Sequence, residues 1–211
     1  MTGDEAIAMN PLAPLIGWID LFGIAVFAAS GALAAAQRGQ TLVTFAFFAL
    51  VTGVGGGTVR DLLIDAPVFW VRDGRVAAVC LGTALLIWAT PRRWWRTRAL
   101  DWFDAVGLAA YAVFGAAKAL AFGVPPVVAV LMGAITACVG GIIRDVLAGE
   151  PSIILRPEIY VAAAALAAGL FVGLSTLGVP ALPAALIGAT TGFLLRALAI
   201  TRGLKLPGYR A

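Results

Sequence analysis

Histidine is absent from the 211 residues of this sequence, and cysteine occurs only as Cys80 and Cys138. Without histidine, the chain lacks the side chain that most often serves as a general base near neutral pH. Both cysteines lie in apolar stretches, where a buried thiol is a more common finding than a disulfide or a metal ligand. No serine has an activating neighbour, and no carboxylate pair has metal-ligand spacing. We therefore expect no enzymatic activity, no metal and no cofactor.

Charged residues are also scarce, since they make up 12% of the chain against 62% hydrophobic residues. Soluble domains carry about 25% charged residues, and no polar block here is long enough to form such a domain. The net charge is +4, but the basic residues cluster at the ends of apolar stretches, where membrane topology explains them. The composition predicts a polytopic membrane protein whose partners include membrane lipids and no nucleic acid.

The apolar stretches predict an all-α membrane protein with seven transmembrane helices, because about 20 mostly apolar residues cross a bilayer. Six of the helices form two three-helix repeats, and the seventh is an accessory helix. The predicted segments are an N-terminal extracytoplasmic tail (1–14), repeat 1 (15–90), a basic cytoplasmic loop (91–101), repeat 2 (102–175), the seventh helix (176–201) and a cytoplasmic tail (202–211).

The basic residues between the spans predict the orientation in the membrane. With the N-terminus outside, the outer loops hold only Arg72 and Arg75. Cytoplasmic segments usually carry the excess of lysine and arginine, and this orientation satisfies that rule. The first fifteen residues hold no lysine or arginine, so the basic start of a secretory signal is missing. The cytoplasmic basic residues are then Arg38, Arg92, Arg93, Arg96, Arg98, Arg156, Arg202, Lys205 and Arg210.

An internal repeat appears when the chain is shifted by 84 residues against itself. Each repeat has an odd number of spans, so the second must enter the membrane from the opposite side. Inverted repeats of this kind place a substrate or ion path near the middle of the membrane, at the repeat interface. The matching residues are Asp20/Asp104, Gly23/Gly107, Gly31/Gly115, Thr52/Thr136, Gly56-Gly57/Gly140-Gly141, Arg60-Asp61/Arg144-Asp145, Pro67/Pro151 and Arg72/Arg156.

Both repeats carry a glycine cluster inside an apolar span. One interpretation is close packing of helices through small residues. The other is a kink or unwound turn whose free carbonyls line a cation path. Nearby threonine hydroxyls would either line that path or bond back to their own helix. The residues are Gly55, Gly56, Gly57, Thr52 and Thr58 in the first repeat, and Gly140, Gly141 and Thr136 in the second.

An arginine and an aspartate follow each cluster, as Arg60-Asp61 and Arg144-Asp145. Charges within a membrane are costly and normally face a protein interior or a cavity. Adjacent helical residues point about 100° apart, so we expect each charge to find its partner on another helix rather than in its neighbour. The network would fix the repeat interface, or line or gate a permeation path. The hypothesised partners are Asp145 or Asp104 for Arg60, and Asp61 or Asp20 for Arg144.

Three further charges lie inside or near spans. Lys118 is the only lysine within a span. It would either extend to the lipid headgroups or face an outer vestibule and act on cations electrostatically. Asp20 and Asp104 lie near predicted span starts, where they would cap helix ends or add negative potential at a pore mouth.

Together these features resemble the prokaryotic branch of the trimeric intracellular cation channel (TRIC) family. The resemblance rests on seven spans, the three-plus-three inverted repeat, and the motifs Gly-Gly-Gly-x-x-Arg-Asp and Gly-Gly-x-x-Arg-Asp. It implies a homotrimer in a prokaryotic plasma membrane, with one pore per protomer that conducts monovalent cations, potassium above all and sodium as a second candidate. It also implies that the second and fifth helices are kinked at their glycine motifs.

The same resemblance matches Lys118 with a lysine on the family's fourth helix. Animal members follow that lysine with Glu-Val, whereas Ala119 and Leu120 follow it here. The resemblance therefore does not imply the animal type of lipid or calcium regulation, and a bound lipid of another kind remains an expectation.

Two other functions fit the same residues. A secondary transporter for a small solute, such as an amino acid, also uses inverted repeats, with Asp61 or Asp145 as the coupling carboxylate. A purely structural membrane protein is disfavoured, because buried charges are costly to keep without a use.

Overall fold

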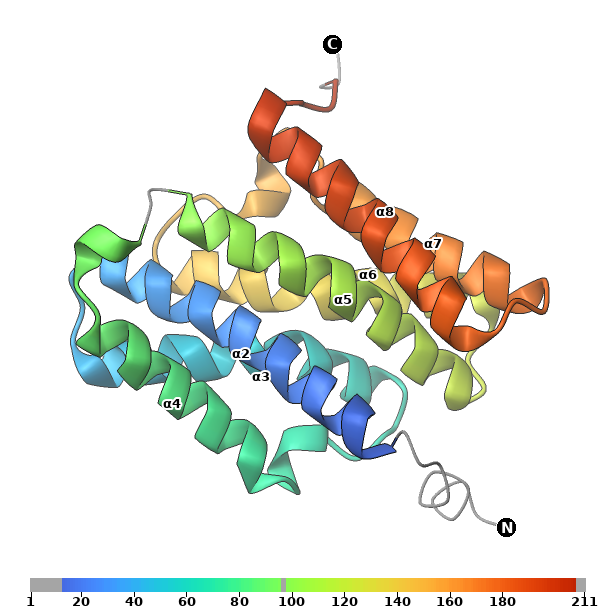
Figure 1. Ribbon diagram of the computed structural model, residues 1–211, viewed down its shortest axis with the longest axis horizontal. Coiled ribbons are helices and arrows are strands. Elements are labelled where there is room, and N and C mark those ends of the chain that lie inside the picture. Colours follow the sequence, from blue (N-terminus) through green and yellow to red (C-terminus); the bar gives the residue numbers. More distant parts are fainter. Residues whose placement is uncertain (1–12, 96–97, 208–211) are drawn as a thin grey trace.

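The computed structural model describes residues 13–95 and 98–207. The predicted N-terminal tail lies almost entirely outside these residues, as do Arg96 and Arg210 of the basic segments. Over the described ranges the chain forms seven α-helices and three short 3₁₀ turns (Figure 1). The helices are α2 (Ala13–Gln37), α3 (Leu42–Leu63), α4 (Gly74–Ala89), α5 (Ala99–Ala121), α6 (Pro126–Leu147), α7 (Val161–Thr176) and α8 (Ala181–Arg202). The turns are η1 (Phe69–Val71), η2 (Arg92–Trp94) and η3 (Ile153–Leu155).

Helix lengths agree with a chain that crosses a bilayer. Five of the described helices are long and apolar enough to do so, whereas α4 and α7 have 16 residues each. The two repeats are α2–α4 and α5–α7, and α8 is the additional seventh helix, as the apolar pattern predicts. Three helices per repeat invert the second repeat relative to the first.

Asp20 and Asp104 lie inside helices rather than at their ends, so the prediction that they cap helices is wrong. The reason is that α2 and α5 extend beyond the apolar stretches at their N-termini, from Ala13 and from Ala99. Both carboxylates instead find side-chain partners on other residues, which are described with the site below.

The two repeats pack against each other through α2 with α5 and α3 with α6. One hydrophobic cluster lies mainly among α2, α3 and α4, and a second lies among α5, α6, α7 and α8. Tyr111 of α5 belongs to the first cluster, so it reaches across the repeat interface. Helix α8 lies along α7 and also contacts α5 (Figure 1).

The glycine clusters lie where α3 crosses α6. A Cβ atom on Gly56 would overlap the carbonyl oxygen of Thr136, and one on Gly140 would overlap the carbonyl oxygen of Thr52. These contacts are equivalent under the shift of 84 residues, so the crossing lies on the axis that relates the repeats. Close helix packing is therefore the structural role of both glycines.

Both helices continue through their glycine clusters without interruption, α3 from Leu42 to Leu63 and α6 from Pro126 to Leu147. The predicted unwound turn is therefore wrong. The tight crossing requires glycine for space alone, and the surrounding helices hold α3 and α6 regular despite the low helix propensity of glycine. A kink at these positions stays a prediction.

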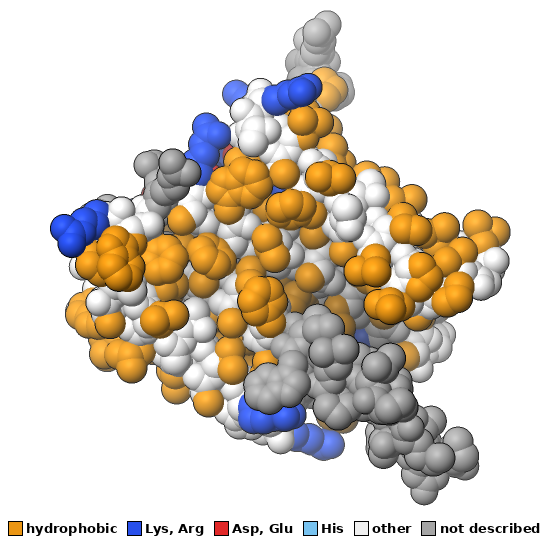
Figure 2. Space-filling model, viewed as in Figure 1, with side chains coloured by type: hydrophobic (Ala, Val, Ile, Leu, Met, Phe, Trp, Pro, Cys, Tyr) orange, Lys and Arg blue, Asp and Glu red, His pale blue; other side chains and the backbone are white. Residues whose placement is uncertain are grey.

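Apolar side chains dominate the visible face of the molecule, and lysine and arginine gather toward its ends (Figure 2). The exposed apolar residues include Leu85 and Leu86 of α4, and Leu182 and Leu186 of α8. A soluble monomer rarely exposes so much contiguous apolar surface. Such a surface suits contact with lipid or with other copies of the chain.

Candidate functional site: two buried charged half-sites

The second repeat holds a fully buried arginine between two carboxylates, which we call the Arg144 half-site. Arg144 Nη1 lies 2.6 Å from Asp104 Oδ1, and its Nε and Nη2 each lie 2.9 Å from Asp145 Oδ1. Arg144 Nη1 also donates to Ser30 Oγ of the first repeat at 3.0 Å. The side chain of Arg144 is only 1% exposed. Two carboxylates thus neutralise one buried cation, and Ser30 ties the group to the opposite repeat.

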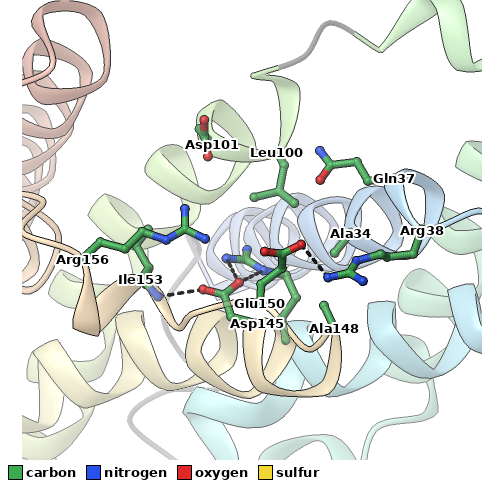
Figure 3. A pocket seen from close by; sticks show the side chains of 11 residues that line it. Ala34, Gln37, Arg38, Leu100, Asp101, Asp145, Ala148, Glu150, Ile153 and Arg156 are labelled. Carbon is green, nitrogen blue, oxygen red and sulfur yellow. Dashed lines mark hydrogen bonds and ion pairs between the residues drawn. The ribbon is translucent and has the colours of Figure 1, made fainter.

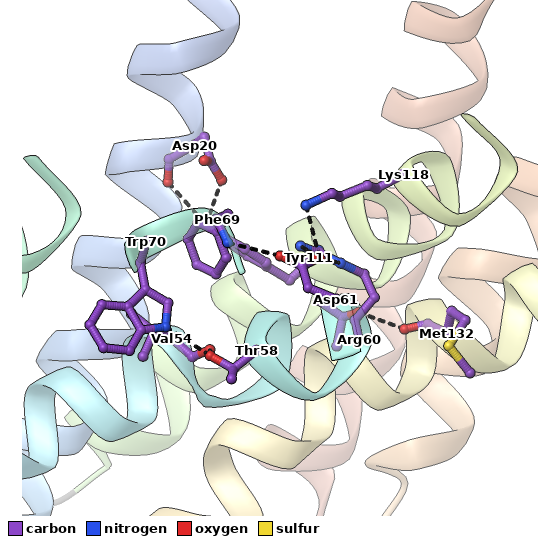
Figure 4. A network of polar contacts seen from close by, with 11 residues as sticks. Asp20, Val54, Thr58, Arg60, Asp61, Phe69, Trp70, Tyr111, Lys118 and Met132 are labelled. Carbon is purple, nitrogen blue, oxygen red and sulfur yellow. Dashed lines mark hydrogen bonds and ion pairs between the residues drawn. The ribbon is translucent and has the colours of Figure 1, made fainter. Parts of the chain in front are cut away.

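The equivalent arginine of the first repeat, Arg60, has different partners. We call this group the Arg60 half-site (Figure 4). Arg60 Nε and Nη2 each lie 2.8 Å from Asp61 Oδ1. Lys118 Nζ lies 2.8 Å from the same oxygen. The Arg60 guanidinium also faces the rings of Phe114, at 5.6 Å, and Phe69, at 5.9 Å. One carboxylate here serves two cations, and aromatic rings cover the arginine.

Each arginine therefore pairs with the aspartate that follows it in the sequence, so the prediction that neighbours do not meet is wrong. The carboxylate is fixed by the loop after the helix, because Phe69 N donates to Asp61 Oδ2 at 3.0 Å and Ile153 N donates to Asp145 Oδ2 at 2.9 Å. The long arginine side chain then folds toward that fixed carboxylate.

The hypothesised partners across the repeats are not found among the described ion pairs. Arg144 does use another helix, but its partner there is Asp104 of its own repeat. Among the buried charges, the contact that joins the two repeats is instead Lys118 with Asp61.

Lys118 points into the protein rather than toward lipid headgroups. Its side chain is 22% exposed, and its ammonium group reaches a carboxylate that is completely buried. Nζ also lies 5.9 Å from the centre of the Phe69 ring and 6.0 Å from that of Phe122. Of the two interpretations from sequence, the geometry agrees with the inward-facing lysine.

Two of the three threonine hydroxyls take the second of the predicted roles, and a role in lining a path stays a prediction. Thr58 Oγ1 donates to Val54 O at 2.7 Å, and Thr136 Oγ1 donates to Met132 O at 2.6 Å, so both bond back to their own helices. Thr58 also accepts a hydrogen bond from Trp70 Nε1. The Thr52 hydroxyl is buried and has no hydrogen-bond partner in the described part of the chain.

Asp20 does not contact Arg60, although its counterpart Asp104 binds Arg144. Tyr111 Oη instead donates to Asp20, 2.8 Å from Oδ1 and 3.0 Å from the backbone oxygen. The sequence analysis missed Tyr111. The shift of 84 residues pairs it with Phe27, and a search for pairs that differ by one polar atom would have found it.

A cavity of about 350 Å³ lies beside the Arg144 half-site, at the cytoplasmic end in the predicted orientation (Figure 3). Arg144, Asp145 and Arg156 line it together with Arg38 and Glu150. Arg38 Nη2 and Glu150 Oε1 are 2.5 Å apart and form an ion pair between the end of α2 and the loop after α6. This cavity brings water-accessible space next to the buried charges.

Arg196 of α8 is a buried charge that the sequence analysis missed. Its Nη1 lies 2.8 Å from Glu158 Oε2, and its guanidinium lies 5.2 Å from the centre of the Tyr160 ring. It is the one arginine inside the seventh predicted span, and a charge inside an apolar span is the signal that could have identified it. Its position shows that α8 is tied to the segment just before α7 by an ion pair whose arginine is buried and whose carboxylate is 32% exposed.

The family comparisons agree with this architecture. A family model described as "Glycine transporter" matches the chain twice, over residues 17–92 and 101–176. The UPF0126 inner membrane protein YadS of Escherichia coli K12 is 41% identical, covering 92% of this chain and 96% of its own length. The UPF0126 membrane protein YvgT of Bacillus subtilis is 37% identical, covering 76% and 80%.

Two solved structures that are similar to this chain are TRIC channels rather than enzymes. The TRIC trimeric intracellular cation channel orthologue from Rhodobacter sphaeroides is 43% identical with a TM-score of 0.82, covering 89% of this chain and 97% of its own. A prokaryotic TRIC channel in 0.5 M KCl is 26% identical with a TM-score of 0.83, covering 91% and 98%.

Fold and site thus define a bacterial membrane protein with two inverted three-helix repeats, each of which encloses a buried arginine–aspartate pair. Within that class, the chain belongs to the prokaryotic TRIC family, to which the "Glycine transporter" family model also assigns it.

Proposed function

We propose that this protein is a channel for monovalent cations, potassium above all, and that it assembles as a homotrimer with one path per protomer. The observation that carries the proposal is the pair of buried half-sites at equivalent places in a fold shared with TRIC cation channels. Charged groups inside a membrane protein usually mark such a path.

The proposed path runs between the two repeats and passes one half-site on each side of the α3–α6 crossing. The ion-paired side chains of the Arg60 half-site carry one excess positive charge, because Asp61 faces both Arg60 and Lys118. Those of the Arg144 half-site carry one excess negative charge, because two carboxylates face one arginine. Cations are then repelled at the Arg60 half-site, toward the outer face in the proposed orientation, and attracted at the Arg144 half-site, toward the inner face.

The preference for potassium over other monovalent cations is proposed to be modest. Strong potassium selectivity in channels relies on rings of backbone carbonyls that replace the hydration shell of the ion. Because α3 and α6 remain helical through their glycines, the carbonyls there stay engaged in helix hydrogen bonds. Electrostatic selection of cations over anions is the property that the charges support.

The proposed orientation has the N-terminus outside and the C-terminus in the cytoplasm. The basic residues of the cytoplasmic loops support it through the positive-inside rule. YadS, a relative of this chain, is named an inner membrane protein, and we propose the same membrane here.

A second candidate, transport of a small amino acid, is favoured by the description of the matching family model as a glycine transporter. In that case the coupling carboxylate would be Asp61 or Asp145, both of which are held by arginine and by a loop N–H group.

Flux from proteoliposomes distinguishes the two functions. The purified protein is reconstituted into vesicles loaded with potassium chloride, and both potassium efflux and uptake of labelled glycine are followed. A channel predicts rapid potassium efflux, no saturation at low concentration and no dependence on glycine. Glycine uptake that saturates and requires a proton or sodium gradient, with no potassium efflux, would refute the channel.

A further inference from the structure

Two equivalent aromatic rings meet where the repeats face each other. Tyr111 of α5 and Phe27 of α2 are related by the shift of 84 residues, and their ring centres lie 5.4 Å apart in an edge-to-face contact. Each ring covers the glycine of the opposite helix, Tyr111 over Gly23 and Phe27 over Gly107. The two positions therefore have matching surroundings, and they differ by one hydroxyl group.

That hydroxyl group decides what the nearby aspartate binds. Tyr111 Oη donates to Asp20 Oδ1 at 2.8 Å. Phe27 has no donor to offer the equivalent aspartate, and Asp104 is free to accept from Arg144 Nη1 at 2.6 Å. Equivalent carboxylates thus have different partners in the two halves of the protein.

This difference also changes the hydrogen bonding of Arg60. Its Nη1 is buried without a hydrogen-bond partner in the described residues, and it is the same atom that Asp104 occupies on the equivalent Arg144. A buried donor left unpaired is costly. Phe114 connects the two groups, because its ring centre lies 5.6 Å from that of Tyr111 and 5.6 Å from the Arg60 guanidinium.

We propose that Tyr111 is a positioning residue that holds Asp20 away from Arg60. The Arg60 half-site therefore keeps one carboxylate rather than two. Asp20 then has two arrangements. In one it accepts a hydrogen bond from Tyr111, as seen in Figure 4, and in the other it pairs with Arg60 as Asp104 pairs with Arg144 in the Arg144 half-site. Two discrete arrangements of packed, charged groups are the kind of element that gates a path.

The second arrangement would clamp Arg60 between Asp20 and Asp61, as Arg144 is clamped between Asp104 and Asp145. Arg60 would be held away from the Phe114 ring, which takes the place that Ser30 has in the inner half. This part of the inference rests on the proposed conduction, because it assigns the exchange of Asp20 to gating of the outer half-site.

A double-mutant cycle tests the positioning role without any measurement of flux. Thermal unfolding in detergent is compared for the wild type, Tyr111→Phe, Asp20→Asn and the double variant. If the hydroxyl only stabilises Asp20, then Tyr111→Phe lowers the midpoint and Asp20→Asn adds little to it. The proposal expects Tyr111→Phe to leave the midpoint unchanged or raise it, because Asp20 moves to the unpaired donor of Arg60.

In the Tyr111→Phe background, Asp20→Asn should lower the unfolding midpoint more than it does in the wild type. The reason is that asparagine can accept a hydrogen bond from Tyr111 but cannot replace the carboxylate that pairs with Arg60. Asp104→Asn is the matched control and should lower the midpoint equally in both backgrounds. A midpoint that falls in Tyr111→Phe and does not fall further with Asp20→Asn overturns the proposal.

Single-channel recording then tests the gating role. Tyr111→Phe should reduce the open probability several-fold at the same voltage, and the double variant should restore it toward the wild-type value. Unchanged gating in a conducting Tyr111→Phe protein overturns the gating role. A wild type that conducts no cations contradicts the proposed function instead, and leaves the unfolding cycle as the test of the positioning role.

Discussion

The crossing of α3 and α6 predicts that replacing glycine with alanine changes stability by different amounts at different positions. In an open helical position the change should stabilise the protein, because alanine exceeds glycine in helix propensity by about 1 kcal/mol. Gly82 of α4 is such a position, since a Cβ there meets nothing within 4 Å. At Gly56 the new Cβ would overlap the backbone oxygen of Thr136, which no side-chain rotation can relieve.

Overpacking of this kind costs about 1–3 kcal/mol, and the rigid backbone contact places Gly56→Ala near the upper end. For a chain of this size each kcal/mol shifts the unfolding midpoint by about 2–4 °C. We therefore expect Gly56→Ala to unfold roughly 6–12 °C below Gly82→Ala. Gly55→Ala should fall between them, because its Cβ would meet the mobile end of the Ile143 side chain at 3.1 Å.

Differential scanning fluorimetry of the purified variants in one detergent measures these midpoints. The comparison with Gly82→Ala removes the common effect of helix propensity, so the remaining difference reports the crossing. A midpoint for Gly56→Ala equal to or above that of Gly82→Ala would refute the role assigned to the glycine clusters.

Three further predictions concern the buried charges. Arg144→Ala should lower the free energy of unfolding by about 3–5 kcal/mol, because two buried carboxylates lose their partner, whereas the exposed Arg93→Ala should change the midpoint little; equal effects would contradict the buried network. Lys118→Ala should raise inward potassium current and reduce the difference between inward and outward current in symmetric potassium, since it removes a positive charge from the outer half-site; an unchanged current–voltage curve would exclude Lys118 from the path. Arg196→Ala should loosen α8 and be detected as faster hydrogen exchange near the start of α7, while Arg202→Ala should leave that exchange unchanged; identical exchange in both variants would show that the ion pair of Arg196 with Glu158 does not hold α8.

Much of the fold could be predicted because membrane-spanning helices are written into the sequence as apolar stretches. The seven apolar stretches correspond to the seven α-helices of the described residues. The repeat could be found because Thr52 and Gly56 recur as Thr136 and Gly140, the residues that form the symmetric crossing. Where the prediction failed, at the supposed unwound turns, neighbouring helices keep weak helix formers regular.

The partners of the charges could not be predicted, because they depend on side-chain reach and on loop geometry. Helical spacing separates Arg60 from Asp61, but the N–H group of Phe69 holds the carboxylate where the arginine can fold onto it. Lys118 of α5 reaches Asp61 near the end of α3 across the repeat interface, and hydropathy does not encode that contact. Tyr111 could not be found from the matching residues, because its counterpart in the first repeat is Phe27, which has no hydroxyl group.

Reversal potential in a planar bilayer tests the central claim most directly. Purified protein is inserted into a bilayer with a potassium chloride gradient, and unitary currents are recorded across a range of voltages. A channel that selects cations through its charged half-sites predicts discrete currents that reverse near the equilibrium potential of potassium. Discrete currents that reverse near the chloride potential, or a bilayer that stays silent while the same preparation takes up glycine, would contradict the account.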